Sequence, residues 1–278
     1  MLGALLMDIV VAFPRSSEFE KAKSRMDSAR LSYGVLSPDP GYSFVGAPAL
    51  ICDPCGIATI QSRDEQLIAV AGWVDRKPAT IAVPQRPPRE FREDIFGQAV
   101  IMFLGPCMAD VTKVRLIAHI SGDLTAVLPH LNTEIRSACF NAKSVFLTFM
   151  DKHRLITLYP RRVTIGKADD LVDGWRTLEF LRVLANSVWA RRAAIPPSYD
   201  MRSKPPALEI YKRLPRTNCK ACGERTCMAF AIRLWRGEAT PSQCAPVFSP
   251  EHARLRGALI EICRGLGVVG SEMDAVDA

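Results

Sequence analysis

The sequence predicts an α+β protein in which two small α/β units precede a short helical, cysteine-rich module. Three observations lead to this prediction. β-rich runs and helical apolar periodicity occur without a regular βαβ repeat, prolines gather at two joints, and four of the nine cysteines lie close together near the C-terminus. With 278 residues, of which 48% are hydrophobic and 23% charged, the chain is long enough for about two domains. This composition excludes disordered and collagen-like proteins.

The first predicted unit covers residues 1–83 and contains a C-x2-C loop. We expect strands at 7–13, 32–36 and 67–74, where apolar and β-branched residues cluster. A helix is expected over 16–30, with Ser16 or Ser17 as its cap. Its apolar stripe has helical spacing and consists of Phe19, Ala22, Met26 and Ala29. The proline-rich segment 84–90 is interpreted as a linker.

The second predicted unit covers residues 91–194 and mixes helices with strands. We expect helices over 91–104, from Asp123 to about His130, and from Asp169 onward. Strands are expected at 113–120, 145–150, 154–159 and 162–167, with a hairpin between the second and third of these. Residues 195–206 have a proline pair at each end, so they predict a domain boundary.

Four cysteines in the last predicted unit, residues 207–278, are the clearest functional motif. Cys219, Cys222, Cys227 and Cys244 follow the spacing C-x2-C-x4-C-x16-C. Four thiolates suit either a [4Fe–4S] cluster or a tetrahedral zinc ion. The spacing favours the cluster, because a zinc ribbon usually has two C-x2-C knuckles and this motif has one.

The residues around these cysteines predict a local framework for the site. A short helix over 207–213 should end before Pro215, and a tight loop containing Gly223 should bring backbone N–H groups toward the cluster sulfides. Thr226 is expected to cap a helix over 227–236, which places Cys227 at its positive end. An apolar wall against water is expected from Met228, Phe230, Ala231 and Leu234.

This block resembles the four-cysteine iron–sulfur domain of the large subunit of the corrinoid iron–sulfur protein, a domain also found in the B subunit of Rnf-type electron-transport complexes. The resemblance covers residues 207 to about 248, through the lead-in IYK-LP, the short segments TNC, CG, TC and FA, and Pro246 two positions after the last cysteine. It implies one [4Fe–4S] cluster that passes single electrons. Corrinoid binding is not carried over, because nothing upstream resembles the corrinoid-binding barrel of that subunit and too few residues follow the module.

The remaining cysteines are divided between one pair and three single residues. Cys52 and Cys55 form CDPCG, which predicts a redox dithiol, a sulfur-handling thiol, half of a second metal site completed by Cys107 or Cys139, or simply two thiols in a turn. The surrounding segment resembles small sulfur/selenium carrier-like domains, with Cys55–Gly56 as the matching pair. Cys107 lies beside Asp110 without defining a site. Cys139 and Cys263 are interpreted as small buried hydrophobic residues.

Charge and cysteine content limit the functional classes. The net charge of +7 permits an acidic partner, and the basic residues occur as short pairs, so we expect an acidic protein rather than nucleic acid. No stretch is apolar enough to span a membrane or to act as a secretory signal, so we expect a cytoplasmic protein with reduced thiols. We expect an electron-transfer or redox-accessory protein of anaerobic metabolism rather than an enzyme. The alternatives are a metal- or sulfur-delivery factor that uses Cys52 and Cys55, and a zinc-stabilised adaptor.

Overall fold

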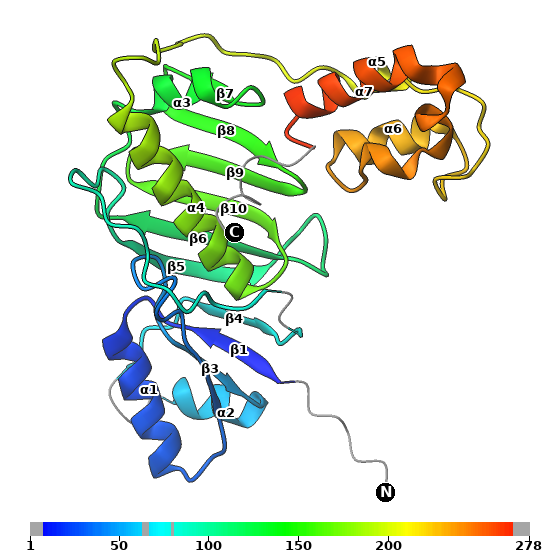
Figure 1. Ribbon diagram of the computed structural model, residues 1–278. Helices are drawn as coiled ribbons and strands as arrows, with labels where there is room; N and C mark the ends of the chain where they lie inside the picture. Colours follow the sequence, from blue (N-terminus) through cyan, green and yellow to red (C-terminus); the bar gives the residue numbers. More distant parts are fainter. Residues whose placement is uncertain (1–7, 63–66, 79–80, 269–278) are drawn as a thin grey trace, which may run out of the picture. The chain divides into compact units, whose positions relative to one another are not determined.

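The computed structural model describes residues 8–62, 67–78 and 81–268 (Figure 1). Residues 1–7, most of the predicted apolar opening, and residues 269–278, the end of the predicted last module, lie outside this part of the chain. The chain forms two compact units. Unit 1 contains the residues up to Leu124 together with Arg161–Ser187, and unit 2 contains Thr125–Pro160 together with the residues from Val188 onward. Both units combine helices and strands, so the predicted α+β class is confirmed. The predicted division into domains at 1–83, 91–194 and 207–278 stays a prediction.

Unit 1 is built on a sheet with the strand order β2-β3-β1-β4-β5-β6-β10. Its strands are β1 (Ile9–Ala12), β2 (Gly34–Leu36), β3 (Ala49–Cys52), β4 (Gly72–Asp75), β5 (Ala99–Pro106), β6 (Val114–Ile120) and β10 (Arg162–Ala168). Neighbouring strands are antiparallel except β4 and β5, which run parallel with Gly72 opposite Leu104. A Cβ atom on Gly72 would lie 1.9 Å from the Leu104 carbonyl oxygen, and the φ of Gly72 is +143°. Only glycine fits at this junction.

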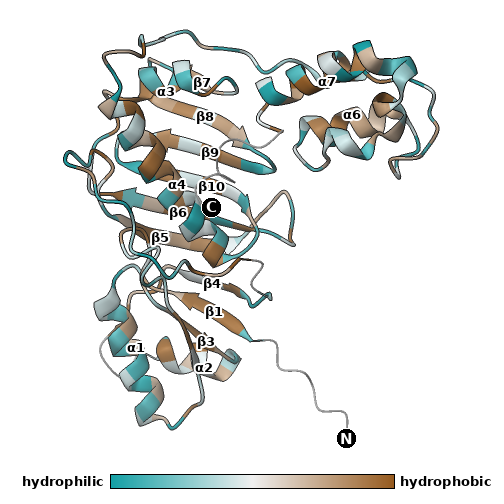
Figure 2. Cartoon of the chain, viewed as in Figure 1, coloured by the Kyte–Doolittle hydropathy of each residue, from teal (hydrophilic) through white to brown (hydrophobic). Residues whose placement is uncertain are grey.

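Helices α1 (Ser16–Ser28) and α2 (Pro54–Ile60) pack on the N-terminal strands. The predicted stripe of α1 is confirmed for Phe19, Ala22 and Met26, which are buried with Val11 and Leu50. Figure 2 shows β1 as hydrophobic and α1 as mainly hydrophilic on the side in view. The predicted serine cap is wrong: Arg15 occupies the cap position without a side-chain hydrogen bond, because both serines already lie inside the first turn.

Helix α4 (Leu171–Ala190) covers strands β5, β6 and β10. Its predicted stripe is buried, with Trp175, Leu178 and Leu181 each at most 1% exposed. Gly174 brings the helix close to the sheet, since a Cβ atom there would lie 2.4 Å from Leu116 Cδ2.

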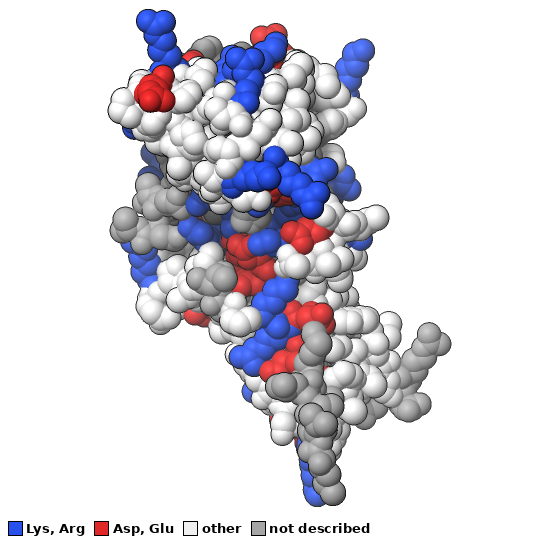
Figure 3. Space-filling view, turned by 90° about the vertical axis from the view of Figure 1, so that its right-hand side faces the viewer, with Lys and Arg blue, Asp and Glu red and all other residues white. Residues whose placement is uncertain are grey.

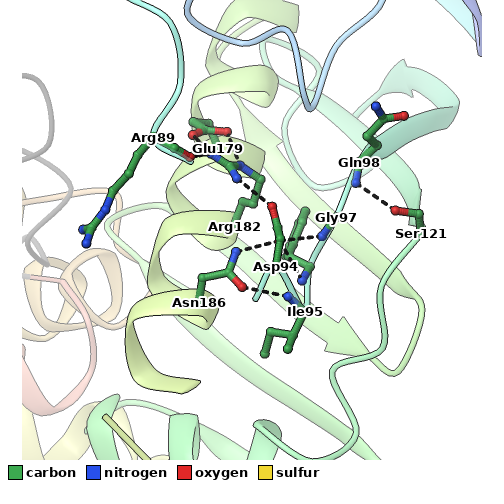
Figure 4. Close-up of polar contacts among 10 residues, drawn as sticks. Arg89, Asp94, Ile95, Gly97, Gln98, Ser121, Glu179, Arg182 and Asn186 are labelled. Carbon is green, nitrogen blue, oxygen red and sulfur yellow. Dashed lines mark hydrogen bonds and ion pairs between the residues drawn. The ribbon is translucent and has the colours of Figure 1, made fainter. Parts of the chain in front are cut away.

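The predicted helix over 91–104 is wrong, because polar side chains of α4 hold this segment in another conformation (Figure 4). Residues 91–98 form no helix, and β5 begins at Ala99. The Asp94 carboxylate accepts hydrogen bonds from the Gly97 N–H at 2.7 Å and from Asn186 Nδ2 at 2.7 Å. The Asn186 side chain in turn accepts from the Ile95 N–H at 2.9 Å. These bonds replace the backbone bonds that a helix would need.

Arg182 is the centre of this polar cluster. Its fully buried guanidinium donates to Asp94 at 2.8 Å and to both carboxylate oxygens of Glu179 at 2.8 and 2.9 Å. It also donates to the Arg89 carbonyl oxygen and lies 4.7 Å from the centre of the Phe44 ring. Burial raises the pKa of Glu179. Burial has the same tendency at Asp94, but the hydrogen bonds from Gly97, Asn186 and Arg182 outweigh it, so the pKa of Asp94 is lowered.

Unit 2 contains three antiparallel strands and the cysteine-rich region. Strands β7 (Cys139–Asn141), β8 (Phe146–Asp151) and β9 (Arg154–Tyr159) lie side by side, which confirms the predicted hairpin. The helix predicted from Asp123 lies later, as α3 (Leu128–Glu134), with Val127 in place of Asp123 at the cap. On α3, the buried Asn132 side chain donates to the carbonyl oxygens of Ser198 and Asp200, each at 3.0 Å, and so holds the segment predicted as a domain boundary.

Residues 207–268, which we call the four-cysteine module, form three α-helices with three 3-10 turns. The α-helices are α5 (Ala207–Tyr211), α6 (Cys227–Trp235) and α7 (Ala253–Gly265), and the 3-10 turns are η1 (Pro241–Gln243), η2 (Ala245–Phe248) and η3 (Pro250–His252). Ile210, Phe230, Val247 and Leu259 belong to its buried core. The Lys152 N–H donates to the Gly267 carbonyl oxygen at 2.8 Å, so the β8–β9 turn contacts the end of the module.

Lys and Arg side chains occur in separate groups on the face shown in Figure 3, with Asp and Glu among them. No helix in the described part of the chain is long and apolar enough to cross a lipid bilayer.

Candidate metal centre

The four cysteines of the predicted motif line one pocket of the four-cysteine module. Cys219 and Cys222 lie on the loop before α6, Cys227 is the first residue of α6, and Cys244 lies between η1 and η2. The excursion along α6 and back through η1 therefore returns Cys244 to the other three. The structure therefore brings together the four cysteines that the sequence spacing predicts as ligands.

The loop before α6 has an unusual backbone. Arg216, Asn218, Lys220 and Gly223 all have positive φ angles, between +51° and +84°. Residues with positive and negative φ thus alternate over 216–220, which is the geometry that turns successive N–H groups toward a common point. Such concave groups of N–H donors bind anions and iron–sulfur centres. The loop therefore presents donors to a group carrying negative charge.

Two side chains fix this loop to the start of α6. Thr226 Oγ accepts from the Ala229 N–H at 3.1 Å, which confirms the predicted cap. Asn218 Oδ1 accepts from the Cys227 N–H at 2.8 Å, although it lies nine residues earlier in the chain. This second contact was not predicted from the sequence. The sequence signal that could have indicated this contact is the preference of asparagine for helix caps and left-handed backbone conformations.

The four thiols differ in exposure and in their surroundings. Cys219 is exposed and Cys222 partly exposed, whereas Cys227 and Cys244 are buried. Hydrogen bonds from the Ala221 N–H and the Thr217 side chain lower the pKa of Cys219. Burial raises the pKa of Cys244, and repulsion from the other three thiolates raises it further. A hydrogen bond from the Val247 N–H lowers this pKa but does not reverse the shift. The pocket thus has one solvent-facing edge and one buried edge.

Apolar residues form the inner side of the site. Phe230, Ala231 and Leu234 on α6 are buried, and Met228 packs against them, as predicted. On the outer side, Arg233 Nη1 pairs with Glu224 Oε1 at 2.7 Å and joins α6 to the loop. These contacts hold the pocket in shape from both sides.

The donor set bears on the kind of metal. The four cysteines that line the pocket form an all-thiolate donor set, which suits a [4Fe–4S] cluster as well as a tetrahedral zinc ion.

Cys52 and Cys55 lie in different surroundings. Cys52 ends β3 and is buried in the core of unit 1, where a Cβ atom on Gly56 would lie 2.9 Å from its sulfur atom. Burial raises the pKa of Cys52 to about 11. Cys55 is exposed in the first turn of α2, which Asp53 caps by accepting from the Gly56 N–H at 2.8 Å. The predicted turn is therefore a strand-to-helix junction, and whether these thiols act together stays a prediction.

The other single cysteines are packed differently. Cys107 and Cys263 are buried, and burial raises the pKa of Cys263 to about 12. Cys139 is partly exposed on β7, so its predicted burial is wrong. It lies on the short outer strand of the unit 2 hairpins, where neighbouring side chains cover it incompletely.

Comparisons with known proteins agree with the site. The family described as "Putative Fe-S cluster" matches residues 214–246. The gamma subunit of the acetyl-CoA decarbonylase/synthase complex of Methanocaldococcus jannaschii is 45% identical over 62 residues, which are 22% of this chain and 13% of that protein. The gamma 2 subunit of Methanosarcina thermophila is 58% identical over 40 residues, 14% of this chain and 8% of that protein.

A third relative extends the same match. The corrinoid/iron-sulfur protein large subunit of Moorella thermoacetica is 39% identical over 70 residues, 24% of this chain and 16% of that protein. The predicted resemblance is thus confirmed: the C-terminal part carries an Fe–S domain homologous to those subunits, which implies an iron–sulfur cofactor. The chain spans less than a fifth of the length of these relatives. No solved structure matches the chain. The N-terminal resemblance to carrier-like domains stays a prediction.

Proposed function

We propose that Cys219, Cys222, Cys227 and Cys244 hold one [4Fe–4S] cluster and that the chain is an electron-transfer or redox-accessory component of a partner enzyme. The observation that carries this proposal is the single pocket lined by all four cysteines, next to a loop with alternating φ signs. When bound, the cluster would supply reversible one-electron transfer.

The surrounding residues have defined tasks in this proposal. Asn218 and Thr226 orient the first turn of α6, whose positive end favours the thiolate of Cys227. Phe230 and Leu234 exclude water from the buried edge, which protects the cluster from hydrolysis. Cys219 is exposed, so electrons would enter and leave at its edge of the pocket.

We infer that the partner is a protein with an acidic docking surface. The relatives named above are subunits of a complex, which supports a protein partner. The net charge of +7 favours an acidic surface on that partner and steers its approach. Corrinoid binding is not part of the proposal, since the match to those relatives is confined to a short segment. A cytoplasmic location fits thiols that must stay reduced.

Metal analysis separates this proposal from its alternatives. Protein purified without oxygen should contain about four iron and four sulfide ions per chain and give an EPR signal after reduction with dithionite. The Cys222→Ser variant should lose most of its iron, whereas Cys139→Ser, which changes a thiol outside the pocket, should retain it.

Three outcomes would contradict the proposal. Stoichiometric zinc without sulfide would favour the adaptor. Normal iron content and EPR signal in Cys55→Ser, together with failure of a partner to mature, would favour the delivery factor. Equal iron loss in the Cys222 and Cys139 variants would show that these measurements do not report the predicted ligands.

A further inference from the structure

A groove in unit 2 combines cationic side chains with an apolar floor. It lies between β7, β8 and β9 on one side and α7 with residues 202–205 on the other, and it encloses about 380 Å³. It shares no lining residue with the four-cysteine pocket. We call it the basic groove.

The charge of the basic groove has one sign. Arg136, Arg202 and Lys204 line it, and none of the described lining residues is Asp or Glu. The Arg202 guanidinium donates to the carbonyl oxygens of Ile135 at 3.1 Å and Arg136 at 3.4 Å, which are neutral acceptors that leave its charge in place. Several positive charges without an acidic lining residue raise the local concentration of anions.

The floor of the groove is apolar. Leu155 and Met150 face each other across β9 and β8, and Ile262 of α7 and Leu266, the residue after α7, contribute the opposite wall. Leu155, the second residue of β9, is 50% exposed. A ligand that covered it would gain hydrophobic free energy in addition to the charge contacts.

We propose that the basic groove binds a small amphipathic organic anion, with its carboxylate, phosphate or sulfonate group at Arg136 and Arg202 and its apolar body over Leu155. The volume is that of small-molecule pockets, which enclose about 300–1,000 Å³ and combine apolar walls with a few polar groups. The inference does not depend on the cluster, since no lining residue is shared.

Fluorescence titration of the full chain with 8-anilinonaphthalene-1-sulfonate tests this inference, with uncharged N-phenyl-1-naphthylamine as the matched probe. The sulfonate should bind saturably with one site and at least about tenfold more tightly than the neutral probe. Arg136→Gln should weaken it about fivefold to tenfold, and Leu155→Asp should abolish saturable binding by placing a carboxylate on the floor. Lys143→Gln removes an exposed charge outside the groove and should leave binding unchanged.

Displacement by decyl phosphate and by decanoate then identifies the preferred head group. Circular dichroism checks that the variants retain their fold, which exposed substitutions should permit. Equal affinity for the two probes, or full binding in the folded Arg136 and Leu155 variants, would overturn the proposal.

Discussion

Only two residues separate Cys52 from Cys55 in the sequence, yet the fold gives the two thiols different surroundings. Cys52 is 3% exposed with a pKa of about 11, so at pH 8 only about a thousandth of it is thiolate. Because thiolate is the nucleophile, iodoacetamide at pH 8 should modify Cys55 and leave Cys52 unmodified. Peptide mass spectrometry of the native and the denatured protein measures both sites, and denaturation should make them react alike. Similar native rates would mean that Cys52 is accessible, and would restore the dithiol hypothesis.

The candidate site shows which residues a sequence can identify. The cysteine spacing identified all four pocket residues, because their chemistry requires thiols at fixed loop and helix positions. Asn218 escaped prediction, because its contact with Cys227 depends on a left-handed backbone conformation that several residues of the loop share. Cys139 was misplaced, since burial depends on which strand lies beside it and not on residue type.

The Arg182 cluster determines how the segment before β5 attaches to α4. Replacing Arg182 by Met would leave Glu179 buried without its cation, so we expect the free energy of unfolding to fall by about 3–5 kcal/mol. Urea denaturation measures this loss. Arg92→Met removes an exposed arginine of the same segment and should change the stability by less than about 0.5 kcal/mol. The double variant Arg182→Met/Glu179→Gln should recover part of the stability. An equal loss in the two single arginine variants would contradict the role assigned to the cluster.

The predicted helices and strands differ in how far the local sequence pattern determines their structure. The hairpin, α4 and α6 were predicted because their periodicity or their cap is encoded within the segment. The segment 91–104 was mispredicted as a helix, because Arg182 and Asn186 bind it from about 90 residues away. Local periodicity contains no information about such partners. Likewise, the parallel pairing of β4 with β5 depends on Gly72 and on its close approach to Leu104 of the neighbouring strand.

At the scale of the whole molecule, the two compact units should respond differently to loss of the cluster. The cysteines of the pocket all lie in unit 2, and the module that holds them has a small core of its own. A cluster bound to four cysteines would join the loop before α6, the start of α6 and the turn between η1 and η2. Binding free energy at such a site is folding free energy, because the unfolded chain does not present it.

Scanning calorimetry of the complete chain, with the cluster and after its removal by chelation under oxidising conditions, tests this coupling. The transition of unit 2 should fall by more than about 10 °C, since a module of this size loses several degrees for each kcal/mol. The transition of unit 1 should stay in place, because its sheet contains none of the four cysteines. Arg182→Met provides the reciprocal control, as it should lower the transition of unit 1 alone. A single transition that shifted in both experiments would mean that the two units unfold together. A unit 2 transition that stayed in place after cluster removal would mean that the cluster does not stabilise the module.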